Sequence, residues 1–166
     1  VARTYARVEG RPEGPNANSI YFDPVWAPDP RHSPFTIAVT RRRVLAGSGS
    51  IYDADIELNE RSEQNPDGFR FVVDQSVLTS RTPEELDELG IRDLHTILVH
   101  ETGHVLGLGH SERAEAAMYF EVESVARPRR VVTTDDVTGV CALYPPDGPL
   151  AALECNTTPR GGFASG

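Results

Sequence analysis

The sequence predicts an α+β domain, with about four short strands first and three helices after them. Two patterns carry this prediction. Apolar and polar residues alternate along residues 51–58, which is typical of a strand with one buried face. Helix-capping residues, each followed by apolar positions three and four apart, come later in the chain. At 166 residues the chain is long enough for one domain with a sizeable core.

The expected strands are bounded by residues that break regular structure. They cover Ser19–Phe22, Phe35–Leu45, Ile51–Leu58 and Phe69–Val73. Residues 1–17 contain two Gly and two Pro, so we expect an irregular N-terminal arm there. Four prolines between residues 24 and 34 exclude regular structure after the first strand. In the third strand, Ala54, Ile56 and Leu58 lie on the face expected to be buried, with Tyr52.

Three helices are expected after the strands. They cover Pro83–Leu89, a segment from Asp93 to Gly107 or Gly109, and Asp135–Tyr144. Thr82, Asp93 and Thr134 are the predicted N-caps, and Gly90 and Pro145 are the stops of the first and third helix. The sides expected to be buried are Leu94, Ile97, Leu98, Glu101 and Val105 in the second helix, and Val137, Val140, Cys141 and Tyr144 in the third.

Composition narrows the function classes. All 16 basic residues are Arg, and 25 acidic residues give a formal net charge of −9. An acidic chain disfavours nucleic-acid binding. No apolar run approaches the roughly 18 residues that cross a bilayer, so no membrane partner is expected. We expect a domain over residues 18–146, followed by a tail over residues 147–166 that is rich in Pro and Gly.

Three histidines form the strongest pattern in the chain. His100 and His104 are four residues apart, so a helix places both imidazoles on one face, one turn apart. Gly107 can adopt positive φ and turn the chain so that His110 supplies a third nitrogen. Three neutral imidazoles suit zinc and leave one coordination position for water. The alternative, a helix with solvent-exposed histidines, does not explain why Gly interrupts an apolar segment just before His110.

The segment HETGHVLGLGH, residues 100–110, resembles the HExxHxxGxxH signature of the metzincin zinc endopeptidases. Met118 with Tyr119 is similar to the methionine turn that lies below the metal in that family. Ser111 after the third histidine, the eight-residue spacing from His110 to Met118, and the segment TTDDVTGVCALYP resemble the matrixin branch, here of bacterial type. IYDADIEL also resembles the matrixin strand before the active-site helix, so the likeness covers roughly residues 18–146.

The resemblance implies a metzincin fold: a twisted, mainly parallel sheet with one antiparallel edge strand, an active-site helix and a C-terminal helix. It also implies a secreted zinc endopeptidase that hydrolyses extended polypeptides. A zinc-activated water would be the nucleophile, with Glu101 as general base and one catalytic zinc held by His100, His104 and His110. Gly107 and Met118 would support the site. An inactive metzincin shell that binds peptides or proteins is the alternative, although Glu101 and all three ligands are present.

Several finer expectations follow from the positions of single residues in the chain and from the resemblance. Tyr119 and Phe120 are candidates for the substrate pocket, and Phe120 stands where the family commonly has Pro. Phe69–Val73 is the candidate sheet edge for substrate pairing. Calcium is common in the family, and Asp53, Asp55, Glu60 and Asp67 could offer oxygens, but no ligand set is assigned.

The remaining histidines and the cysteines leave alternatives open. Only His32 and His95 remain for the second, structural zinc of matrixins, so we expect no such site. Cys141 and Cys155 form either a disulfide, which the expected secretion favours, or two free thiols. The sequence does not indicate an oligomeric state.

Overall fold

The computed structural model describes residues 18–26, 33, 35–120, 128–145 and 147–148. The predicted N-terminal arm and most of the predicted tail, with Cys155, lie outside the described residues, as does His32. In the part of the chain that is described, no helix is both long and apolar enough to cross a membrane.

The main sheet has three strands in the order β1-β3-β2. They are β1 (Ile20–Asp23), β2 (Ala38–Val44) and β3 (Ile51–Asn59). β1 runs parallel to the central strand β3, whereas β2 pairs antiparallel with β3 and forms an edge. The expected antiparallel edge strand is therefore present.

A second, smaller sheet joins β4 (Arg70–Val72) and β5 (Ile91–Asp93) in parallel. A single bridge between Glu60 and Phe69 links the end of β3 to the start of β4. The prediction had no counterpart of β5, which has only three residues and shows no periodicity.

The helices are α1 (Gln75–Thr79), α2 (Pro83–Glu88), α3 (Leu94–Val105) and α4 (Thr134–Leu143). The predicted capping box of α2 is confirmed, because Thr82 Oγ1 accepts from the Glu85 N–H while the Glu85 carboxylate accepts from the Thr82 N–H. Asp93 caps α3 as predicted. Helix α4 begins one residue earlier than predicted, with Thr133 as its cap. The five-residue helix α1 was not predicted.

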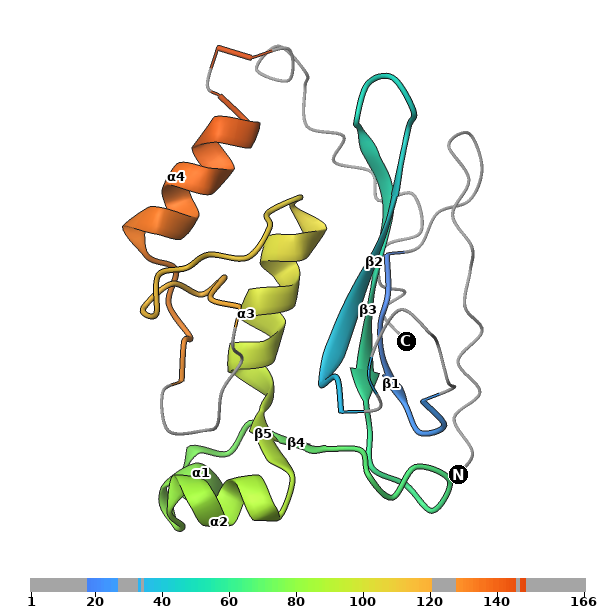
Figure 1. Ribbon diagram of the computed structural model, residues 1–166, viewed down its shortest axis with the longest axis vertical. Coiled ribbons are helices and arrows are strands. Elements are labelled where there is room, and N and C mark those ends of the chain that lie inside the picture. The colour runs from blue at the N-terminus through green and yellow to red at the C-terminus, as the bar shows by residue number, and fades with distance from the viewer. Residues whose placement is uncertain (1–17, 27–32, 34, 121–127, 146, 149–166) are drawn as a thin grey trace, which may run out of the picture.

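Helix α3 lies between the main sheet and α4 (Figure 1). Ile97 on α3 packs against Ile56 and Leu58 of β3, and all three are at most 3% exposed. Burying three large aliphatic side chains contributes on the order of 5 kcal/mol before the entropy cost of ordering them. This contact fixes α3 against the sheet.

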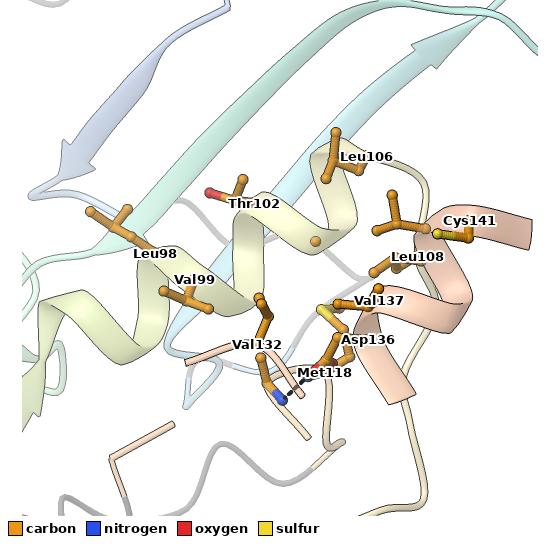
Figure 2. A pocket seen from close by; sticks show the side chains of 13 residues that line it. Leu98, Val99, Thr102, Leu106, Leu108, Met118, Val132, Asp136, Val137 and Cys141 are labelled. Carbon is orange, nitrogen blue, oxygen red and sulfur yellow. Dashed lines mark hydrogen bonds between the residues drawn. The ribbon is translucent and has the colours of Figure 1, made fainter. Parts of the chain in front are cut away.

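The predicted buried side of α4 is only partly correct. Val137 and Tyr144 are 48% and 38% exposed, and Cys141 is also exposed. Val137 and Cys141 border an apolar cavity of about 420 Å³ between α3 and α4, which the described residues leave unfilled (Figure 2). Val137, Val140 and Cys141 line it from α4, opposite Leu98, Val99 and Thr102 of α3.

Candidate metal centre

Helix α3 carries the first two histidines and is anchored at its N-terminus by Asp93. The Asp93 carboxylate accepts from the His95 N–H at 3.3 Å and from Thr96 Oγ1 at 2.7 Å. The guanidinium of Arg130, just before α4, donates one bond to each oxygen of this carboxylate, at 2.7 and 3.0 Å. Burial alone raises the pKa of Asp93, but these bonds outweigh it and hold that pKa below its ordinary value. The start of the helix is thereby tied to a distant segment.

The C-terminus of α3 turns sharply at Gly107, which has φ of +100°, as the sequence predicted. The Gly107 N–H bonds to the His104 carbonyl at 2.9 Å, and the Leu108 N–H bonds to the Gly103 carbonyl at 3.0 Å. This pair of bonds is a Schellman motif, which ends a helix and needs a residue in the left-handed region. It sends the chain back toward the helix and brings His110 to the other two rings.

The three imidazoles converge. Their candidate ligand nitrogens all lie within 4.8 Å of one another, and His104 Nε2 is 3.2 Å from His110 Nε2. Two nitrogens bound tetrahedrally to one zinc at 2.0–2.1 Å would be about 3.3 Å apart. No other group of three or more His, Cys, Asp or Glu among the described residues could hold a metal ion.

Backbone carbonyls orient two of the rings. His100 Nδ1 lies 2.8 Å from the Ala117 carbonyl, and His104 Nδ1 lies 2.9 Å from the Leu108 carbonyl. Because a carbonyl can only accept, each Nδ1 carries the proton and each Nε2 presents its lone pair. This is the ring state that binds a metal, held by the kind of outer contact that raises metal affinity.

The electrostatics of the rings also favour metal binding. Burial lowers the pKa of all three imidazoles, and the pKa of His100, which is 4% exposed, falls to about 4. The neighbouring histidines and Arg129 lower the pKa of His100 further, against the Ala117 carbonyl. The rings are therefore neutral at pH 7 and do not need to lose a proton to bind zinc.

Glu101 lies beside these rings and is 6% exposed. Burial raises the pKa of its carboxyl, while a hydrogen bond from Thr40 and the nearby His110 act in the opposite direction. Thr40 Oγ1 is 2.5 Å from Glu101 Oε2. A buried carboxylate next to three imidazoles has the environment expected of a general base.

Met118 packs against the side of α3 that faces α4. It is 3% exposed, and its sulfur lies so close to α3 that a Cβ added to Gly103 would be 2.1 Å from it. Only glycine at position 103 lets the methionine pack there. A β-bridge joins Ser111 to the segment of Met118 and Tyr119. In it the Ser111 N–H bonds to the Met118 carbonyl at 2.6 Å. The residue after His110 is therefore bonded to the segment that carries Met118.

Asp136 at the start of α4 holds the methionine turn in place. Its carboxylate accepts from the N–H groups of Ala117 and Met118 at 3.0 Å each, and from the N–H and hydroxyl of Thr133 at 2.7 and 2.8 Å. Figure 2 shows Asp136 and Met118 side by side below α3. Burial raises the pKa of Asp136, but the four bonds outweigh it and the pKa is lowered. The charged form is thus kept.

Comparison with protein families agrees with this geometry. Residues 40–145, more than half of the chain, match the family model of the matrixins. The chain belongs to the matrixin family.

Individual relatives match shorter parts of this matrixin. Metalloendoproteinase 1-MMP of Arabidopsis thaliana is 46% identical over 59 residues, which is 35% of this chain and 16% of the relative. Metalloendoproteinase 2-MMP of the same plant is 33% identical over 100 residues, 59% of this chain and 26% of the relative. Stromelysin-1 of Equus caballus is 46% identical over 61 residues, 36% of this chain and 13% of the relative. These alignments thus span about a quarter or less of each relative's length. No solved structure matches the chain significantly.

The matrixin site opens into a cleft of about 700 Å³. One wall is formed by residues 35–40 and Arg42, which include most of the edge strand β2, and the other by Ile97, the three histidines and Glu101. Phe120 is 52% exposed and lines this cleft, whereas Tyr119 does not line it and packs under the guanidinium of Arg129 at 4.7 Å. Of the two predicted pocket residues, the structure places only Phe120 in the cleft.

The predicted substrate edge at Phe69–Val73 is wrong. β4, which covers most of that segment, pairs with β5 and contributes nothing to the cleft lining. The open edge beside the histidines belongs to β2 instead, since β2 has β3 on one side only in the described sheet.

The remaining predicted residues lie away from the metal centre. His95 is exposed on α3. Asp53 and Asp55 are 2% and 1% exposed on β3, where Asp53 is 3.3 Å from Arg43 and Asp55 accepts from Ser19. Asp67 is exposed and Glu60 is half-buried. Together these four acids do not form a cluster suited to a metal ion in the described structure.

Two residues of the site were missed by the sequence reasoning, Thr40 and Asp136. For Thr40 the signal was a polar residue on the face of β2 where Ala38, two positions earlier, is apolar. For Asp136 the only signal was the position three residues after Thr133, where a capping carboxylate is common.

Proposed function

We propose that this matrixin is a zinc-dependent endopeptidase that hydrolyses peptide bonds of extended polypeptides. One observation carries the proposal: three neutral imidazoles converge beside a buried carboxylate, in a cleft bordered by an edge of β2 that no strand of the described sheet covers. Zinc bound by His100, His104 and His110 would supply Lewis-acid activation of water and of the scissile carbonyl.

The open edge of β2 is suited to bind the backbone of the substrate. The Asn59 N–H bonds to the Ile37 carbonyl at 3.0 Å, and hydrogen-bonded pairs alternate along an antiparallel ladder. The N–H and C=O groups of Ala38, Thr40 and Arg42 therefore point away from β3, toward the cleft side. An extended peptide can add there as a further strand, which places a peptide bond next to the histidines.

Glu101 is the proposed general base. It takes a proton from the attacking water and delivers it to the leaving nitrogen, a contribution of typically 10²- to 10⁴-fold. Gly107 and Met118 hold the ligand geometry, and Phe120 is proposed to contact the substrate side chain at the cleft. Secretion and the use of bound calcium belong to the same proposal on the strength of family membership alone.

The test is cleavage of a quenched fluorescent peptide library with and without a zinc chelator. We expect turnover that the chelator abolishes and added zinc restores. Glu101→Ala should retain one zinc by elemental analysis and lose nearly all turnover, whereas His104→Ala should lose the metal. A wild-type protein that binds zinc and peptide but cleaves nothing would instead support a binding module.

A further inference from the structure

We propose that Thr40 is a positioning residue that holds the general base in its working orientation. Thr40 and Glu101 are 61 positions apart in sequence. The Thr40 hydroxyl lies 2.5 Å from Glu101 Oε2 and 3.2 Å from the Glu101 carbonyl oxygen. This inference rests on the proposed peptidase activity, since it concerns the same carboxylate.

The geometry of β2 explains why the contact involves position 40. Thr40 pairs with Ile56, whose side chain is buried in the core against α3. Directly opposite residues in a ladder point to the same face of the sheet, so Thr40 also points toward α3. Its hydroxyl then meets Glu101, in the second half of α3.

The bond leaves one oxygen of the carboxylate available. Among the described residues, Oε2 is the oxygen of the Glu101 carboxylate that accepts a hydrogen bond, and the donor is Thr40. Hydrogen bonds to a charged oxygen are short and strong, and they restrict rotation of the carboxylate. Oε2 is therefore fixed by Thr40, and Oε1 remains to accept the proton of the attacking water.

Thr40 also connects the base to the substrate edge. Its side chain holds Glu101, while its backbone groups lie on the open side of β2 where the substrate strand is proposed to pair. A substrate that forms strand hydrogen bonds at position 40 is aligned with the base by a single residue. Loss of the hydroxyl should leave those backbone bonds intact, so it should reduce kcat and leave KM nearly unchanged.

Thr40→Val tests this, because valine keeps the shape and the β-branching and removes only the hydroxyl. We expect kcat to fall on the order of 10-fold or more, part of the general-base contribution, with KM within about twofold. Zinc content should stay close to wild type, whereas the thermal midpoint should fall by a few degrees, because the buried Glu101 carboxylate loses a hydrogen bond. Thr40→Ser, which restores the hydroxyl, should recover most of kcat. Thr138→Val removes an exposed hydroxyl bonded to the Thr134 carbonyl on α4, and it serves as the matched control.

A double mutant separates positioning from a purely structural role. In a Glu101→Ala background, Thr40→Val should reduce the residual turnover no further, because the group that it positions is absent. Three results would overturn the role of Thr40 without touching the proposed function. They are an additional loss of turnover in that background, a wild-type kcat in Thr40→Val, and failure of Thr40→Ser to recover activity. If the wild-type protein shows no chelator-sensitive cleavage, the proposed function fails and this inference fails with it.

Discussion

Replacement of Asp136 by Asn tests whether the methionine turn depends on the first turn of α4. The two side chains have nearly the same shape, but Asn offers one acceptor oxygen and two N–H donors. In the structure one carboxylate oxygen accepts from Met118, and the other accepts from Ala117 and twice from Thr133. If the Asn oxygen takes the place of the carboxylate oxygen that accepts from Ala117 and Thr133, the Asn NH₂ group must face the Met118 N–H.

The expected cost follows from these contacts. One hydrogen bond to a charged acceptor is worth about 1.5–3 kcal/mol, and the other three become bonds to a neutral acceptor. We therefore expect Asp136→Asn to lower the free energy of unfolding by about 2–4 kcal/mol, a large part of the 5–15 kcal/mol typical of a domain. Zinc affinity should fall about 10-fold or more, because Ala117 links this carboxylate to His100.

Urea unfolding of the chelated protein measures the first effect, and zinc competition against a chromogenic chelator measures the second. Asp135→Asn is the matched control for stability, since it removes the same charge from the same helical turn. Asp135 has a half-exposed side chain that bonds to Ser111 at 2.7 Å, so we expect a cost of about 1 kcal/mol or less. Equal unfolding free energies for the two variants would refute the role given to Asp136.

Three further predictions concern the metal centre. Without metal, the free energy of unfolding should fall as the pH drops from 6.5 to about 4, because His100 takes up a proton in the unfolded chain but not in the folded one. The loss from this group is about 3 kcal/mol. A flat profile of unfolding midpoint against pH would contradict this prediction. Gly103→Ala should weaken zinc binding about 10-fold by displacing Met118, whereas Gly109→Ala, whose added Cβ meets nothing within 4 Å, should bind zinc like wild type in the same competition assay. Zinc at about 1,000 times its Kd should stabilise the wild-type protein by about 4 kcal/mol in a thermal or urea titration but leave His104→Ala unchanged, and equal stabilisation of both would place the metal elsewhere.

Local sequence signals predicted the parts of the structure that local interactions determine. The capping box at Thr82, the Asp93 cap and the turn at Gly107 each involve residues within six positions, and all three are present. The histidine spacing belongs to the same class, because one helical turn and one Schellman motif bring the rings together. These features could be predicted without knowledge of the sheet.

The features that were missed depend on contacts between distant segments. Which strand borders the cleft depends on how the strands pair, so Phe69–Val73 was a reasonable but wrong candidate for the edge. The Thr40 to Glu101 contact spans 61 positions, and the bonds from Asp136 to the methionine turn span 18 and 19. The apolar side of α4 predicted burial, but periodicity does not reveal whether a facing helix fills the space.

An open strand edge also has a cost for a protein at high concentration, because two copies can join through it into a continuous sheet. β2 carries Arg41, Arg42 and Arg43 in succession, and two copies pairing antiparallel about Arg42 would bring like charges opposite one another. Arg41 and Arg43 lie beside Glu57 and Asp53 of their own β3, while Arg42 is exposed at the cleft. The edge thus repels a second copy of itself, and it stays accessible to foreign chains that lack this positive charge.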